Sequence, residues 1–156
     1  MIVLIQLTIL ILLPSSHVYG CATTLLPGQT APPRRIHVAA LRKLGVSKEP
    51  LLQYPSQAKK EKAQGVAAVD ICFDSTGHVA VVSVLSAPHV SIKQSLERVL
   101  SDLMVVNVPP KWGSRTQVVR WVFYYLNTNG AYLVVDTSRP PSPIEASALK
   151  SAYQAP

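Results

Sequence analysis

The chain has 156 residues and a formal net charge of +7, which is enough length for one domain around a single hydrophobic core. Lysine and arginine are scattered, with doublets only at Arg34-Arg35, Arg42-Lys43 and Lys59-Lys60, so the positive charge does not favour nucleic-acid binding. The four histidines have no metal-ligand spacing and no nucleophile motif is present, so we predict no metal site, no cofactor and no enzyme.

The first twenty residues have the pattern of a signal peptide. Met1 to Leu13 is an apolar run of about 13 residues, too short for a membrane span of ~20 but suited to a signal peptide. Val18-Tyr19-Gly20-Cys21 follows and resembles the bacterial lipobox, whose cysteine becomes the lipid-modified first residue of the mature chain. We therefore expect a signal peptide over 1–20 and lipidation of Cys21. Ordinary secretion after cleavage near Gly20 and an uncleaved anchor are the alternatives.

The fate of Cys21 decides what the second cysteine does. If Cys21 carries a lipid, Cys72 is a lone thiol on a strand and behaves as a small buried apolar residue. If Cys21 is not acylated, a Cys21–Cys72 disulfide can form in an oxidising periplasm. Ala22 stands where lipoproteins kept at the inner membrane typically carry Asp. The lipobox resemblance thus implies a lipid anchor on the periplasmic face of the outer membrane.

Residues 21–49 have the composition of a linker, here a lipid-anchored one. Pro27, Gly28, Pro32 and Pro33 interrupt regular structure in this segment. Within it, residues 36–44 predict a short basic helix. Residues 50–62 predict a helix-like segment leading into the domain, with Pro55 acceptable near a helix start.

A β-hairpin is the strongest signal in the chain. Gly65–Phe73 alternates apolar residues with period two, which is typical of a half-buried strand. Asp74–Gly77 is a four-residue turn with Asp and Gly in suitable places. The β-branched run His78–Leu85 then predicts the second strand.

An apolar stripe at helical spacing follows the hairpin and predicts an amphipathic helix on the sheet. Its members are Ile92, Leu96, Val99, Leu100 and Leu103. Pro109-Pro110 ends any helix, and Gln117–Leu126 then predicts an aromatic-rich third strand. Alternation separates the two faces of this strand, and the sequence leaves open which face meets the helix. Val119, Trp121, Phe123 and Tyr125 lie on one face, and Arg120, Val122 and Tyr124 on the other.

A short fourth strand and a proline-rich tail complete the chain. Asn127–Gly130 is a turn signal, and Ala131–Val135 predicts a strand that folds back on the third one. Residues 137–156 predict a disordered tail, with a short helix at Ile144–Tyr153 as the alternative. Together the elements predict an α+β domain over 50–136, with a small antiparallel sheet in β-β-α-β order and a helix packed on one face.

This order and two short motifs resemble the TonB C-terminal domain family over roughly residues 51–135. The family has Tyr-Pro before a helix that ends at a Gly, which Tyr54-Pro55 and Gly65 match. Its hairpin turn carries Asp and Gly, matched by Asp74 and Gly77. Leu103–Pro110 departs from the family, which usually has Arg and Trp there.

The TonB resemblance implies a binding domain in energy-coupled transport across the outer membrane. An extended peptide of an outer-membrane transporter would add to the sheet edge beside the third strand. The residues implied at that interface are Gln53, Tyr54, Pro55, Gln117, Val118, Val119, Arg120, Trp121, Val122, Phe123, Tyr124 and Tyr125. Core packing is the alternative for the aromatic side chains among them. A fourth strand paired at this edge would be either a protective cover or an internal competitor of the peptide.

Two functions therefore remain as hypotheses. The first is a TonB-like adaptor or energy transducer, bound to an outer-membrane transporter. The second is a structural envelope lipoprotein that holds another periplasmic protein without energy transduction. The linker favours the second, because 29 residues extend at most ~100 Å at about 3.3–3.6 Å per residue. The sequence also allows a homodimer.

Overall fold

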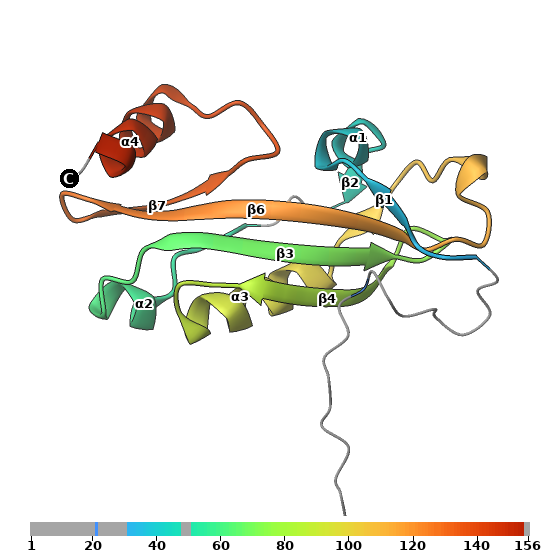
Figure 1. Cartoon of the computed structure of the whole chain (residues 1–156), viewed down its shortest axis with the longest axis horizontal. Helices are drawn as coiled ribbons and strands as arrows, with labels where there is room; N and C mark the ends of the chain where they lie inside the picture. Colours follow the sequence, from blue (N-terminus) through green and yellow to red (C-terminus); the bar gives the residue numbers. More distant parts are fainter. Residues whose placement is uncertain (1–20, 22–30, 48–50, 155–156) are drawn as a thin grey trace, which may run out of the picture.

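The computed structural model of the chain describes Cys21 and residues 31–47 and 51–154. The expected signal peptide at 1–20 lies outside these residues, as do Pro27 and Gly28 of the expected linker. The described part is an α+β fold with a five-stranded sheet, a separate two-stranded sheet and two substantial helices (Figure 1).

The predicted hairpin is confirmed. β3 (Gly65–Phe73) and β4 (Val79–Ser86) are antiparallel neighbours, and Asp74 organises the turn between them. The Asp74 carboxylate accepts the backbone N–H of Thr76 at 2.8 Å and that of His78 at 3.1 Å. This local capping is the reason that Asp is favoured at the start of such turns.

β6 (Gln117–Thr128) is the strand around which the sheet is built. One edge of β6 pairs with β3 in antiparallel fashion along the whole of β3. The other edge is shared by two strands from opposite ends of the chain, β1 (Arg34–Ile36) and β7 (Ala131–Asp136). The fold-back of the fourth predicted strand onto the third is confirmed. The expectation of a purely antiparallel sheet was wrong, because β1 runs parallel to β6 and makes the sheet mixed.

The first face of the sheet packs against α3 (Val90–Ser101). The hydrophobic stripe of α3 is buried there, with Ile92, Leu96 and Leu100 fully covered. The buried strand residues of the same core are Ala67, Val69, Ile71 and Phe73 of β3, and Val119, Trp121, Phe123 and Tyr125 of β6. The structure thus answers the question that alternation left open. Burial of each large apolar side chain stabilises the fold by about 1.5–3 kcal/mol, which makes this seam the main core.

The second face is covered in two separate places. α4 (Pro143–Gln154) lies along β7 and β6 at one end of the sheet, where Ala148 packs with Leu126 and Val135 (Figure 1). At the other end, Cys21 packs with Cys72 and Val118. The expectation of a disordered tail over 137–156 was therefore wrong, because the helix left as the alternative forms and packs on the second face of the sheet.

The segment expected to be a linker also contributes to the fold. α1 (Val38–Lys43) confirms the predicted basic helix and buries Val38 and Leu41 in the main core. The three residues of β1 precede it. Farther along, the segment 50–62 that was expected to be helix-like is helical only in α2 (Ser56–Lys60), and Pro55 occupies the position before the first helical residue, without a side-chain capping bond.

A two-stranded sheet braces the hairpin turn. β2 (Val46–Ser47) pairs with β5 (Met104–Val105), and the Val105 N–H donates to the Gly77 carbonyl at 2.8 Å. Gly77 has a φ of +88°, and a Cβ at this position would lie 2.6 Å from Val108 Cγ2. The glycine of the turn is thus required both by backbone conformation and by close packing. A short 3₁₀ turn at Pro110–Trp112 leads from here toward β6.

Candidate strand-docking edge

The outer edge of β6, which faces away from β3, is the site that the sequence implicates in partner binding. β1 pairs with it in parallel over Gln117–Val119, and β7 pairs in antiparallel fashion over Phe123–Thr128. Between them lies a short gap at Arg120–Val122. Thr137 closes part of this gap, because its backbone N–H and its hydroxyl both donate to the Val122 carbonyl, at 3.3 and 2.8 Å.

Asp136 fastens the end of β7 to β6 beside this gap. The Trp121 indole N–H donates to Asp136 Oδ1 at 2.6 Å, and the Ser138 N–H donates to the same oxygen at 2.8 Å. Arg42 pairs with the other carboxylate oxygen, and its guanidinium carbon lies 5.5 Å from the centre of the Trp121 ring. This geometry combines a charge-assisted hydrogen bond with a cation–π contact. Detachment of β7 therefore requires disruption of a largely buried polar network.

Tyr54 of the Tyr-Pro motif is a buried packing residue. Its hydroxyl donates to the Ala63 carbonyl, and its ring meets Tyr125 and Tyr132 edge-on, at centroid distances of 5.3 and 4.9 Å. Burial raises the pKa of the Tyr54 and Tyr125 hydroxyls, since the phenolate form would lose its solvation. The motif thus joins the leading segment to β6 and β7. Of its neighbours, Gln53 is exposed and Pro55 is half-buried.

The candidate side chains on β6 divide by face. Those in the main core face α3 and offer a partner only their backbone; they are Val119, Trp121, Phe123 and Tyr125. Gln117 is also buried, and Val118 packs against the cysteines on the second face. The more accessible side chains are Arg120, Val122 and Tyr124. A partner at this edge would therefore interact mainly with backbone groups.

Arg120 sits over a buried carboxylate on the second face. Its Nε and Nη2 atoms donate to the two oxygens of Asp70 at 2.8 and 2.9 Å. The Asp70 side chain is only 3% exposed, whereas that of Arg120 is 48% exposed. The hydrogen bonds and charge of Asp70 raise the pKa of Arg120. This pair lies next to the gap in the covered edge.

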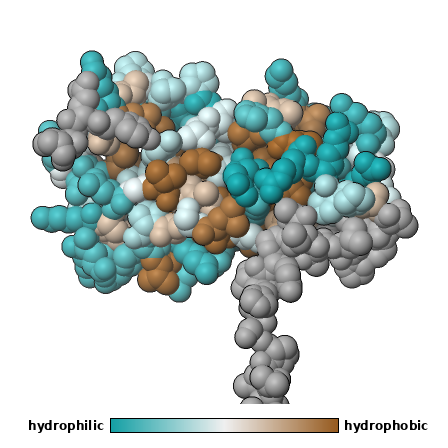
Figure 2. Space-filling view, viewed as in Figure 1, coloured by the Kyte–Doolittle hydropathy of each residue, from teal (hydrophilic) through white to brown (hydrophobic). Residues whose placement is uncertain are grey.

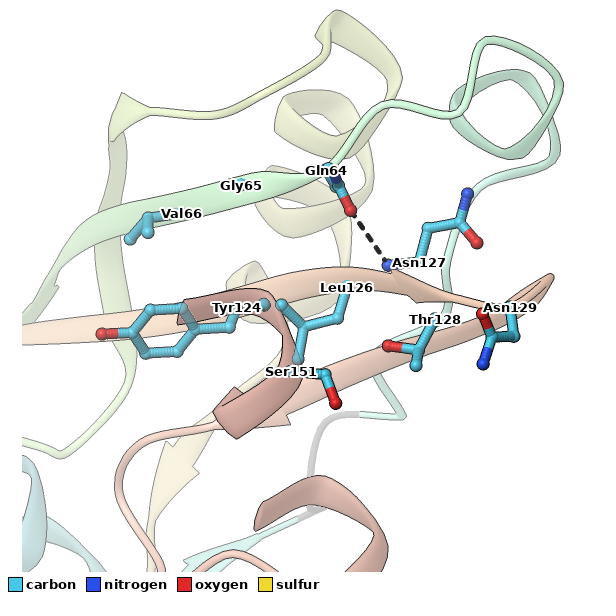
Figure 3. Close-up of a pocket in the computed structure, with 10 residues that line it drawn as sticks. Gln64, Gly65, Val66, Tyr124, Leu126, Asn127, Thr128, Asn129 and Ser151 are labelled. Atoms are coloured by element: carbon cyan, nitrogen blue, oxygen red, sulfur yellow. Dashed lines mark hydrogen bonds between the residues drawn. The ribbon is translucent and has the colours of Figure 1, made fainter. Parts of the chain in front are cut away.

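A pocket of about 430 Å³ opens beside α4 on the second face. Figure 3 shows Val66 of β3 and Tyr124 and Leu126 of β6 around this space, with Ser151 of α4 across from them. The Gln64 side chain accepts the Asn127 N–H at 3.4 Å at its rim. The pocket has an apolar floor with amide and hydroxyl groups around it. Tyr124 and Leu126, on the second face of β6 and close to the strand-docking edge, are accessible from this pocket.

Cys21 and Cys72 form a disulfide, with their Cα atoms 5.8 Å apart. Both residues are 2% exposed. The sequence left this bond as the alternative to a lipid on Cys21. Because one sulfur atom cannot carry a thioether and a disulfide together, the two are exclusive states of Cys21.

Large exposed apolar side chains on the described residues are dispersed. They are Leu51, Val66, Leu85, Val90, Val106 and Ile144. Figure 2 shows brown patches separated by pale and teal atoms on the side in view.

Among the described residues no group of three or more His, Cys, Asp or Glu side chains could hold a metal ion. Within the same part of the chain, no helix has both the length and the apolar character needed to cross a bilayer.

Sequence reasoning missed β1 beside the site and gave α4 only as an alternative to a disordered tail. β1 is only three residues long, too short for a periodic signal, and follows two prolines. α4 did carry a usable signal in Ser142-Pro143-Ile144-Glu145, which has the spacing of a capping box with proline at the first helical position.

Comparison of the chain with protein-family models, curated proteins and solved structures gives no match.

Proposed function

We propose that the protein is a TonB-like adaptor of the bacterial envelope. It binds an extended segment of an outer-membrane transporter, or of another envelope protein, by strand addition at the outer edge of β6. In its anchored form it is a lipoprotein on the periplasmic face of the outer membrane. Energy-coupled transport across that membrane is the process in which it acts.

The observation that carries this proposal is the double use of the outer edge of β6. That edge accepts β1 in parallel and β7 in antiparallel orientation. Its backbone groups are therefore able to pair with strands of either direction. A partner strand could therefore bind by replacing β1 or β7 at this edge, with no change in the rest of the sheet.

The surface supports a backbone-directed mode of binding. The exposed apolar side chains of the described residues are scattered, and the aromatic side chains of β6 are largely committed to the core. Affinity would then come from main-chain hydrogen bonds along the edge. Selectivity would come from the side chains that remain reachable, Arg120, Val122 and Tyr124.

A structural envelope lipoprotein without energy transduction is the second candidate. The Asp136 network favours it, because β7 is tied to β6 and to Arg42 of α1 by several polar contacts. In that case β7 is a permanent cover that protects the edge from aggregation. Partner binding would then use another surface.

Peptide binding by the full chain and by a chain without β7 distinguishes the two candidates, because a permanent cover leaves the full chain with no measurable affinity, whereas a displaceable one leaves it with a weaker affinity. We expect a chain that ends at Asn129 to bind a synthetic peptide from the periplasmic N-terminal segment of a transporter more tightly than the full chain does. The physical reason is that the peptide no longer has to displace β7. Affinities are measured by titration calorimetry, after hydrogen exchange shows that the β3–β6 ladder of both chains is intact.

Equal affinities in two folded chains would contradict the competitor role of β7. Absence of binding to either chain would contradict strand addition by a transporter peptide. A pull-down from envelope extract addresses energy coupling separately. Recovery of inner-membrane motor proteins supports the transducer, and recovery of other envelope proteins alone supports the structural role.

A further inference from the structure

The pocket beside α4 lies between three elements of the fold. The start of β3 and the end of β6 line its floor, and Ser151 and Ala152 of α4 line one wall (Figure 3). One helical turn before this wall, Ala148 packs against Leu126 and Val135 and so holds α4 on the sheet. The volume of about 430 Å³ lies within the range of about 300–1,000 Å³ that is usual for small-molecule sites.

The floor of the pocket contains an exposed cross-strand pair. Val66 of β3 is the direct partner of Tyr124 of β6, so both side chains lie on the second face. Val66 is 45% exposed, although β3 is an inner strand with β4 and β6 on its two sides. α4 thus leaves apolar side-chain surface exposed on an inner strand, and a ligand in the pocket would bury it.

The rim of the pocket offers neutral hydrogen-bonding groups. Figure 3 shows the side-chain amides of Gln64, Asn127 and Asn129 toward the turn between β6 and β7. Each amide has both a donor and an acceptor group. The Ser151 hydroxyl donates to the Ser147 carbonyl at 3.1 Å, which leaves the hydroxyl oxygen as an acceptor for a ligand.

The absence of charge in the lining restricts the ligand further. None of the described residues that line the pocket has a charged side chain, although the whole chain has a net charge of +7. A charged ligand would lose solvation in this pocket without gaining a partner of opposite charge. The ligand that fits is therefore neutral, has hydrogen-bond donors and acceptors, and has an apolar face.

We propose that this pocket binds a neutral N-acetylated saccharide. The C–H face of the sugar ring packs on Val66 and the Tyr124 ring, and the acetamido group and hydroxyls bond to the amides of Gln64, Asn127 and Asn129. An acetamido group combines a donor, an acceptor and a methyl group, which matches amides beside apolar side chains. A fatty acyl chain would cover the same amides without bonding to them. The site uses side chains on the second face and does not depend on strand addition at the outer edge of β6.

Titration of the purified full chain with N,N′-diacetylchitobiose, followed by NMR of the backbone amides, tests the site. We expect shifts concentrated at the pocket, in residues 64–66, 127–129 and 151–152. Cellobiose has the same linkage but a hydroxyl in place of each acetamido group. It should therefore bind at least about tenfold more weakly, since hydrogen bonds and methyl burial are lost.

Two variants and a matched control place the ligand. Ala152→Trp should abolish binding, because the indole fills the space between α4 and the floor. Ala146 is exposed on the same helix and does not line the pocket, so Ala146→Trp should bind as the unmodified chain does. Asn129→Gly removes one amide at a backbone φ of +50°, which glycine tolerates, and should weaken binding by about two- to tenfold.

Each other result would overturn the proposal. No shift with diacetylchitobiose up to its solubility limit would exclude the saccharide, and shifts concentrated outside the pocket would exclude this site. Equal affinities for the two disaccharides would exclude recognition of the acetamido group. Unchanged binding by a folded Ala152→Trp variant would contradict occupation of the pocket. If that variant does not fold, unchanged binding by Asn129→Gly would contradict the amide contacts instead.

Discussion

At the scale of single residues, the Asp70 carboxylate on the second face is a buried group whose lost solvation must be compensated. It is buried with its charge, and Arg120 supplies two hydrogen bonds that compensate for the lost solvation. Loss of the arginine would leave the carboxylate buried and unpaired. The cost of that state exceeds the gain from the pair itself.

We therefore expect Arg120→Met to lower the free energy of unfolding by about 1–3 kcal/mol, the penalty for an unsatisfied buried polar group. The double variant Asp70→Asn with Arg120→Met should recover part of this loss, since the charge that needs compensation is gone. Urea denaturation of the three proteins measures both values. A double variant less stable than Arg120→Met would show that the carboxylate is not the source of the cost.

Leu96 and Glu97 test which side of α3 stabilises the fold. Leu96 is fully buried against the sheet, as its place in the predicted stripe required, whereas Glu97 makes only a 4.0 Å contact with Lys93 at the surface. Leu96→Ala should cost about 2–5 kcal/mol of stability through lost burial and a cavity. Glu97→Ala should cost under ~0.5 kcal/mol. Thermal melting compares them, and similar shifts would contradict the assigned face.

At the scale of elements, the sequence predicted those with a long periodic signal and missed the shortest ones. β3, α3 and β6 each carry many residues in one pattern, so their types and approximate bounds were readable. β1, β2 and β5 have two or three residues, and their positions depend on partners far away in the chain. No local pattern can encode such pairing. The roles of the β6 side chains likewise became clear only when α3 and α4 had been placed on their faces.

The N-terminus of α4 depends on one carboxylate. Glu145 accepts hydrogen bonds from Arg139 at 2.6 and 2.9 Å and from the Ser142 N–H at 2.7 Å. The Arg139 side chain in particular lowers the pKa of Glu145 to about 2. A carboxyl group with a lowered pKa in the folded state stabilises that state fully above its unfolded pKa of 4.5 and loses this effect as the pH falls toward 2.

We accordingly expect α4 to lose protection from hydrogen exchange as the pH falls from about 4.5 to about 2. In this range the opened state takes up a proton on Glu145, whereas the folded state keeps the carboxylate ionised until about pH 2. The exchange of peptides from 143–154 is measured at several pH values and corrected for intrinsic rates. In Glu145→Gln, α4 should be less protected at neutral pH and should lack this pH dependence. The same pH dependence in both proteins would assign the effect to another carboxyl group.

At the scale of the whole molecule, the sequence predicted the α+β class and the order of the main elements, but not the composition of the sheet. The mixed sheet arises because residues expected to form a linker return to β6 as β1. The tail likewise returns as α4. Both additions come from segments rich in proline, which look unstructured when read locally. The position of β1 is determined by the edge of β6 with which it pairs, and that of α4 by the apolar residues of β6 and β7 on which it packs.

The two cysteines make anchoring testable on the whole protein. Cys21→Ala should release the protein from the membrane fraction or leave it unprocessed, because it removes the sulfur that the proposed lipid anchor needs. Cys72→Ala should leave membrane anchoring intact, since it removes only the disulfide partner. Detergent partitioning and gel mobility of both variants measure the effect. Identical behaviour of the two variants would contradict lipidation at Cys21.

Because β6 is central in the sheet but late in the chain, the sheet can be completed only late in synthesis. β1 precedes β6 in the chain, yet it finds its neighbour only when β6 has emerged, and until then β3 is paired on one edge only, with β4. The growing chain therefore carries β1 without a partner strand and β3 with one open edge, and the sheet closes within the last part of synthesis. A nascent chain that stalls before Gln117 leaves the edge of β3 that pairs with β6 open along its whole length. Such an open strand edge can pair with other chains and is a site of aggregation.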